Sequence, residues 1–248
     1  MLQITKLRKA FGGVKALTDL DLSVNVGEVL GLIGPNGSGK TTTVNVLTGV
    51  YRASSGSVVM DGVEVTTKKP EQIARSGVVR TFQNLRIFKT QSVLDNVRIG
   101  QSIHCKTFVS RINALSTGAE KARRREADEL LERFSLAERR QWPADSLSYG
   151  EKKRLEIARA LAMRPKILLL DEPAAGMNPI EVDKLMEIIR SIRDSGIGIL
   201  LIEHHMKLVM NVCDRIAVLN FGVKIAEGTP TAIAADPAVI ESYLGKAA

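Results

Sequence analysis

The chain has 248 residues, of which 44% are hydrophobic, 25% are charged and 4% are aromatic, a composition typical of a soluble globular protein with a substantial core. So few aromatic residues argue against a β-sandwich and against a protein that stacks many bases. The net charge of +8 leaves three interpretations open: attraction to nucleic acid, attraction to an anionic membrane surface, or a charged exterior that only faces solvent.

The sequence shows neither a membrane span nor a signal-peptide core. Its longest apolar runs, residues 167–170 and 197–202, are far shorter than the roughly 20 residues that cross a bilayer. Cys105 and Cys213 stand far apart without metal-ligand spacing, so we expect two reduced thiols. These features predict a cytoplasmic chain that reaches a membrane only through a partner.

The N-terminal part is typical of β structure. Apolar positions alternate through residues 1–30 around a turn at Gly12-Gly13, and the alternation is strict from Leu20 to Val26. Residues 56–65 predict a hairpin around Asp61-Gly62, a pair that type I′ turns favour.

Short apolar strands that alternate with helices indicate an α/β core. A nearly continuous apolar strand suits a parallel sheet that is covered on both faces. The predicted strands of this kind are 29–33, 167–170 and 198–202. The predicted helices between them are 40–48, 181–195 and 205–212.

Residues 92–163 have almost no strand signal and are rich in Arg, Glu, Ala and Leu. We interpret them as a mostly helical insertion, with its clearest helices at 120–134 and 151–163. The predicted organisation is a single domain, 1–248, with an α/β core at 1–91 and 164–248 and a helical lobe at 92–163.

A glycine-rich segment follows the first apolar strand and matches the pattern G-x-x-x-x-G-K-[ST]. Its glycines let backbone N–H groups face phosphate oxygens, and the next helix adds its positive N-terminal dipole. Lys40 is expected to reach the β- and γ-phosphates, and the Thr41 hydroxyl to bind Mg²⁺. The expected nucleotide-binding residues here are Gly34, Pro35, Asn36, Gly37, Ser38, Gly39, Lys40, Thr41 and Thr42.

Two carboxylates follow the strand 167–170, at the edge where parallel sheets bind ligands. Asp171 is predicted to hold Mg²⁺, directly or through water, and Glu172 to act as general base on the attacking water. The alternative is that Asp171-Glu172-Pro173 is only the polar start of a loop.

Leu147-Ser-Tyr-Gly-Glu151 precedes an amphipathic helix. By itself it is a helix N-terminus with Ser148 as cap and Glu151 three residues later. It also resembles the L-S-G-G-Q signature of ABC ATPases. That resemblance implies that Ser148, Tyr149, Gly150 and Glu151 bind the γ-phosphate of a nucleotide held by a second protomer.

The order and spacing of the motifs resemble the ABC ATPase family along most of the chain. The resemblance implies a P-loop NTPase (RecA-like) α/β core with an antiparallel β subdomain and a helical lobe. It gives Phe11 the role of stacking on adenine, although a core phenylalanine before a Gly-Gly turn is the alternative. It makes Gln83 the glutamine that senses Mg²⁺ and water, and His204 the histidine that contacts the γ-phosphate.

The closer resemblance is to ATPase subunits of bacterial importers for branched-chain amino acids. Thr81-Phe-Gln-Asn-Leu-Arg86, Leu155-Glu-Ile-Ala-Arg-Ala-Leu161 and the tail from Ala226 carry it. Asn178 replaces an aspartate of the general pattern and is typical of this subfamily, whereas His205 stands where the subfamily usually has Asp.

The resemblance implies an ATPase that uses ATP and Mg²⁺ in a head-to-tail pair of cassettes. The expected partners are membrane permease subunits, a second ATPase subunit in a homo- or heterodimer and, indirectly, a solute-binding protein, with no nucleic acid. The expected location is the inner face of the cell membrane. Alternatives are a related amide or urea importer, an ABC ATPase acting on nucleic acid or ribosomes, and a non-hydrolysing subunit.

Overall fold

A four-stranded antiparallel sheet forms the N-terminal part of the protein. The computed structural model describes residues 1–81, 85–104 and 117–244. The strand order of this sheet is β2-β1-β4-β5. Its strands are β1 (Leu2–Phe11), β2 (Val14–Val24), β4 (Ser55–Met60) and β5 (Val63–Glu64).

The turns of this sheet agree with the sequence. Asp61 and Gly62 connect β4 to β5 with φ angles of 47° and 79°, the positive values that a type I′ turn requires. The predicted alternation of buried and exposed residues holds through Val24, where β2 ends. It fails at its last position, Val26, which is exposed.

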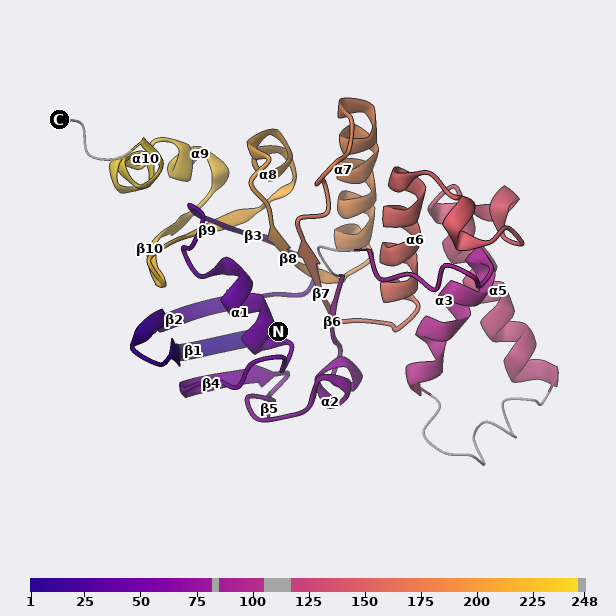
Figure 1. Cartoon of the computed structure of the whole chain (residues 1–248), viewed down its shortest axis with the longest axis horizontal. Coiled ribbons are helices and arrows are strands. Elements are labelled where there is room, and N and C mark those ends of the chain that lie inside the picture. Colours follow the sequence, from indigo (N-terminus) through magenta and orange to yellow (C-terminus); the bar gives the residue numbers. More distant parts are fainter. Residues whose placement is uncertain (82–84, 105–116, 245–248) are drawn as a thin grey trace.

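A six-stranded sheet lies beside the antiparallel one (Figure 1). Its order is β10-β9-β3-β8-β7-β6, and only β10 runs antiparallel to its neighbour. The sequence predicted the three central strands but not β6, β9 or β10. The strands are β3 (Val29–Ile33), β6 (Val78–Arg80), β7 (Ile167–Asp171), β8 (Gly198–Ile202), β9 (Arg215–Asn220) and β10 (Val223–Gly228).

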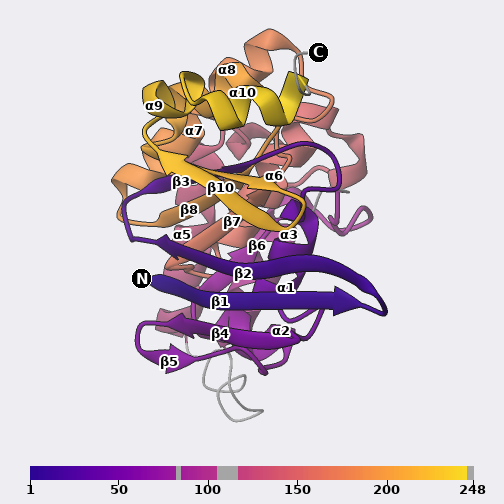
Figure 2. The same cartoon turned by 90° about the vertical axis from the view of Figure 1, so that its left-hand side faces the viewer.

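Both faces of the six-stranded sheet are covered, which explains the continuous apolar strands. Alternate residues of β3, such as Leu30 and Ile33, belong to different hydrophobic clusters. Figure 2 shows helices α7 to α10 on one side of this sheet and the antiparallel sheet on the other. The helices of the core are α1 (Lys40–Leu47), α2 (Pro70–Arg75), α7 (Pro179–Asp194), α8 (Met206–Val212), α9 (Pro230–Ala234) and α10 (Pro237–Leu244).

A helical region connects β6 to β7 and lies at the right of Figure 1. It contains α3 (Val93–Gln101), α5 (Thr117–Arg133) and α6 (Tyr149–Leu161), with 3-10 turns at Ser102–His104, Ala137–Arg139 and Ala144–Ser146. The helices predicted at 120–134 and 151–163 correspond to α5 and α6. The proposed domain limits, 91/92 and 163/164, fall in the segments that flank this region, and the division itself stays a prediction.

No helix in the described ranges is long and apolar enough to cross a membrane.

Candidate functional site

The glycine-rich segment forms the loop between β3 and α1. Gly34 has a φ of 148°, and a Cβ atom on it would lie 2.1 Å from the carbonyl oxygen of Leu219. Gly39, just before α1, has a left-handed φ of 107°. Both positions need glycine, because any side chain would meet backbone or strain the turn.

The cation of this loop is held among backbone carbonyls. The Lys40 ammonium donates hydrogen bonds to the carbonyl oxygens of Gly34 (2.7 Å) and Pro35 (3.0 Å). Burial lowers the pKa of Lys40, and the carboxylates of Glu172 and Asp171 oppose that shift. The Ser38 hydroxyl is buried and has no hydrogen-bond partner within the described part of the chain. This arrangement suits an anion such as a phosphate group.

The first of the two acids makes an ion pair that the sequence did not reveal. Asp171, at the end of β7, is 3% exposed, and its Oδ2 lies 2.6 Å from the Arg80 guanidinium. Arg80 ends β6 and also donates to the amide oxygen of Asn45 on α1 (2.7 Å). A basic residue at the end of a buried strand was the signal that could have indicated this contact.

The second acid lies at a strained turn beside the histidine. Glu172 has a φ of 47°, a left-handed value uncommon for a residue with a side chain. Its N–H donates to the carbonyl of Ile202 (2.9 Å), and its Oε1 lies 4.0 Å from Nδ1 of His204. The structure thus brings together Lys40, Asp171, Glu172 and His204 at the carboxyl edge of the parallel strands.

A cavity of about 310 Å³ opens over the glycine-rich loop. Its walls include residues 36–42, Glu172, residues 14–16 of β2 and Phe221. Phe221, in the turn between β9 and β10, is 84% exposed and was missed by sequence reasoning, although an aromatic residue before a hairpin glycine could have pointed to it. Bases stack on such exposed rings.

Phe11 does not line this cavity. Its ring packs edge-on against Tyr51, with centroids 5.2 Å apart, and the Lys9 ammonium lies 4.6 Å from the Phe11 centroid. The ring remains 43% exposed, and its stacking on adenine stays a prediction.

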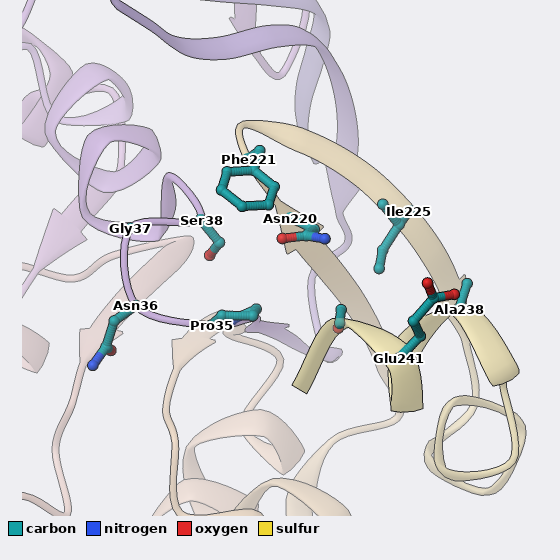
Figure 3. A pocket seen from close by; sticks show the side chains of 10 residues that line it. Pro35, Asn36, Gly37, Ser38, Asn220, Phe221, Ile225, Ala238 and Glu241 are labelled. Atoms are coloured by element: carbon teal, nitrogen blue, oxygen red, sulfur yellow. The ribbon is translucent and has the colours of Figure 1, made fainter. Parts of the chain in front are cut away.

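A second cavity, of about 510 Å³, lies on the other side of the same loop. Figure 3 shows Pro35 and Ser38 on one side and the β9–β10 hairpin with α10 on the other. The two cavities share Asn36, Gly37, Ser38 and Phe221.

Ser148 is the N-cap of α6, as the sequence predicts. Its hydroxyl accepts from the N–H of Glu151, and the Glu151 carboxylate accepts from the N–H of Ser148. Gly150 packs against Glu181 of α7, where a Cβ atom would lie 2.3 Å from the carboxylate oxygen. None of the residues 148–151 lines the cavity over the glycine-rich loop.

Asn178 and His205, which depart from the family pattern, are also helix caps. The Asn178 amide oxygen accepts from the N–H of Glu181 at the start of α7 (3.0 Å). His205 Nδ1 accepts from the N–H of Leu208 at the start of α8 (3.4 Å). Asparagine and aspartate serve equally well as caps, so the start of α7 tolerates Asn178 in place of an aspartate.

A groove of about 320 Å³ lies between the core and the helical region. It is lined by parts of α2, β6 and α6, by Thr48 and Val50 just after α1, and by Ile103. Arg80, the partner of Asp171, is one of its residues. Glu71, Arg80, Glu156 and Arg159 contribute charged groups to a surface that is otherwise largely apolar.

Two residues singled out by the sequence, Gln83 and Cys105, lie outside the described residues. Cys213 is buried, and burial raises the pKa of its thiol to about 12. In the described ranges, no group of three or more His, Cys, Asp or Glu side chains could hold a metal ion. The fold and the site define a P-loop nucleotide-binding protein.

Comparisons with known proteins identify the family. The model of a family described as ABC transporter matches residues 17–175, and that of the branched-chain amino acid ATP-binding cassette transporter matches residues 223–248. The chain is 44% identical to the high-affinity branched-chain amino acid transport ATP-binding protein BraF of Pseudomonas aeruginosa, over 100% of this chain and 98% of that protein. It is 42% identical to LivG of Escherichia coli over the same shares.

Solved structures agree. A nucleotide-free ATP-binding cassette from an ABC transporter superposes with a TM-score of 0.86 at 35% identity. The ADP conformation of the cassette MJ1267 gives 0.87 at 35% identity, and each match covers 99% of both chains. This chain belongs to the ATP-binding cassette subunits of ABC transporters, and it is an ATPase that binds ATP.

Proposed function

We propose that this chain hydrolyses ATP to power a membrane importer of branched-chain amino acids. The observation that supports it best is that four predicted site residues lie close together. Lys40 and Glu172 line the cavity over the glycine-rich loop, Asp171 acts on the Lys40 charge, and His204 lies 4.0 Å from Glu172. The substrate class is supported by the match of residues 223–248 and by the names of the relatives at 42–44% identity.

In this proposal the glycine-rich loop binds the phosphates. Lys40 leaves its two carbonyl acceptors and places its charge on the β- and γ-phosphates, while loop N–H groups surround them. Thr41 and Asp171, with Gln83, would hold magnesium, which supplies positive charge against the phosphates when bound. The donor set fits such an ion, because Mg²⁺ is usually bound by one or two carboxylates, here that of Asp171, together with phosphates and water.

Hydrolysis needs a base for the attacking water and a group that contacts the γ-phosphate. Glu172 accepts the proton of the water, and His204 contacts the γ-phosphate from a side chain that is 69% exposed. The exposure of His204 suits a residue that meets its target only when nucleotide and a second cassette close the site.

The signature turn acts on the other protomer of a head-to-tail pair. In support, residues 148–151 are absent from the cavity over their own glycine-rich loop. The groove beside Arg80 is the docking place for a permease subunit, which positions the chain at the membrane as a peripheral protein. We propose no role in nucleic-acid binding.

The test is Glu172→Gln in the purified protein, with Lys40→Ala for comparison. We expect Glu172→Gln to lose ATP turnover but to bind ATP in a stable dimer, seen by size-exclusion chromatography. Lys40→Ala is expected to lose both nucleotide binding and dimerisation. Unchanged turnover in Glu172→Gln refutes the assigned base.

The substrate class needs a transport measurement. In cells that carry the matching permease, loss of this chain should abolish uptake of labelled leucine, and the unaltered chain should restore it while Lys40→Ala does not. Uptake of urea or an amide instead of leucine points to the related importers.

A further inference from the structure

Glu203 is a buried carboxylate in a place where the roles proposed above assign nothing. It directly follows β8 and is 1% exposed. Its Oε1 accepts from the N–H of Ala174 (2.8 Å), and its Oε2 accepts from the N–H groups of His204 (3.1 Å) and His205 (3.2 Å). A buried charge is costly unless such donors satisfy it.

These three hydrogen bonds, which we name the Glu203 bridge, join two loops. One loop follows β7 and carries Glu172; the other follows β8 and carries His204. Asp171 pairs with Ile202 in the sheet, and the Glu172 N–H reaches the Ile202 carbonyl. The bridge therefore continues the contact between β7 and β8 beyond the ends of these strands, through a side chain.

The bridge lies next to a strained position. Glu172 keeps a φ of 47°, which persists only where the surrounding contacts determine it. The Ile202 carbonyl fixes its own N–H, and the Glu203 bridge fixes Ala174, two residues later. The turn also has a backbone hydrogen bond from the N–H of Ala175 to the carbonyl of Glu172 (3.2 Å), but only the Glu203 bridge ties it to the loop that carries His204 by a side chain. We expect loss of the bridge to shift the Glu172 carboxylate relative to His204.

We propose that Glu203 is a positioning residue for ATP hydrolysis, which holds Glu172 and His204 in register with each other. The inference rests on the proposed roles of those two residues. The geometry asks for a carboxylate: both oxygens accept, whereas the amide of glutamine would turn an N–H group toward an N–H donor. A displacement of about 1 Å in a catalytic group can cost about a hundredfold in rate.

The hydrogen bonds of Glu203 do not include the glycine-rich loop. The inference thus separates hydrolysis from binding. Glu203→Gln should lower kcat about tenfold or more, with ATP affinity changed by less than about twofold. Glu132→Gln, on the exposed face of α5, is the matched control and should leave both values unchanged.

The measurements are kcat and KM for ATP, binding of a fluorescent ATP analogue, and cooperative thermal unfolding. In the Glu172→Gln background, Glu203→Gln should leave the ATP-trapped dimer intact, since the bridge acts on hydrolysis. Loss of nucleotide binding or of the trapped dimer overturns the inference, as does a kcat equal to that of the control.

Glu203→Asp covers the case in which Glu203→Gln does not fold. It keeps the charge but draws it back by one carbon, and a folded Glu203→Asp protein with unchanged kcat overturns the inference. If neither variant unfolds cooperatively, Glu203 is structural and the inference is wrong. If Glu203→Gln keeps kcat while Glu172→Gln abolishes it, only this inference fails; if Glu172→Gln keeps turnover, the proposed function fails first.

Discussion

Several residues of the ATP site adopt backbone conformations that most side chains avoid, among them Gly34 and Glu172. Gly34 sits at a φ of 148° against the Leu219 carbonyl, and Glu172 sits at 47°. The first conformation lets the loop pass close to β9. The conformation of Glu172 costs on the order of 1–3 kcal/mol. It occurs at the proposed general base, whose carboxylate lies 4.0 Å from His204.

Gly34→Ala and Gly37→Ala form a matched pair for this contact. Both glycines have positive φ, but a Cβ on Gly34 meets Leu219 at 2.1 Å, whereas a Cβ on Gly37 has no atom within 4 Å. Both variants carry the backbone strain of an alanine at positive φ, on the order of 1–3 kcal/mol. We expect Gly34→Ala to lower the free energy of unfolding well beyond that and to weaken ATP binding more. Urea denaturation measures the free energy of unfolding of the two variants, and nucleotide titration measures their ATP affinity. Equal losses in both variants contradict the importance of the close approach between Gly34 and Leu219.

At the scale of elements, three helices begin with a side-chain cap at residues that the sequence singled out. Ser148 caps α6, Asn178 caps α7 and His205 caps α8. The cap places each helix N-terminus, with its positive dipole, at a defined point of the surface. The residues proposed to bind the partner's nucleotide thus also determine where α6 starts.

His205 is the side-chain cap of α8. Since an Asp oxygen accepts the same hydrogen bond from Leu208, His205→Asp should keep or raise the free energy of unfolding, whereas His205→Ala should lose about 0.5–2 kcal/mol. Chemical denaturation of the two variants checks this. A His205→Asp protein as unstable as His205→Ala is the opposing outcome.

At the scale of the whole molecule, one residue links the groove between the core and the helical region to Asp171, the residue proposed to bind Mg²⁺. Arg80 contacts Asp171 and also lines the groove. A permease segment in the groove would therefore press on the same part of the sheet that carries the acids. A single side chain, that of Arg80, therefore links the proposed permease-docking groove to the residue proposed to bind Mg²⁺.

Val50→Asp tests the docking place, with Val63→Asp as its control. Both valines are 52% exposed, but Val50 lines the groove and Val63 lies on β5. A charge in the apolar groove should reduce co-purification with the permease and retention on membranes, and leave the ATPase activity of the free subunit unchanged. Val63→Asp should match the unaltered protein. Equal retention of both variants removes the groove from the proposal.

Local patterns carried much of the sequence prediction. The strand 29–33, the hairpin at Asp61-Gly62 and the cap at Ser148 depend on residues within a few positions of one another. Covalent spacing and backbone preferences determine such features without help from distant parts of the chain. The short strand β6 and the last two strands of the sequence, β9 and β10, depend instead on pairing with neighbouring strands. The sequence pattern did not predict them.

The sequence by itself determined that this chain has a P-loop, an acidic pair after a buried strand and a signature turn, because each is a pattern of adjacent residues. Only the tertiary structure decided what those residues touch. Arg80 meets Asp171 across 91 positions of sequence, and Glu203 meets Ala174 across 29. No periodicity encodes such contacts, because they arise when separate strands align in one sheet and bring their following loops together.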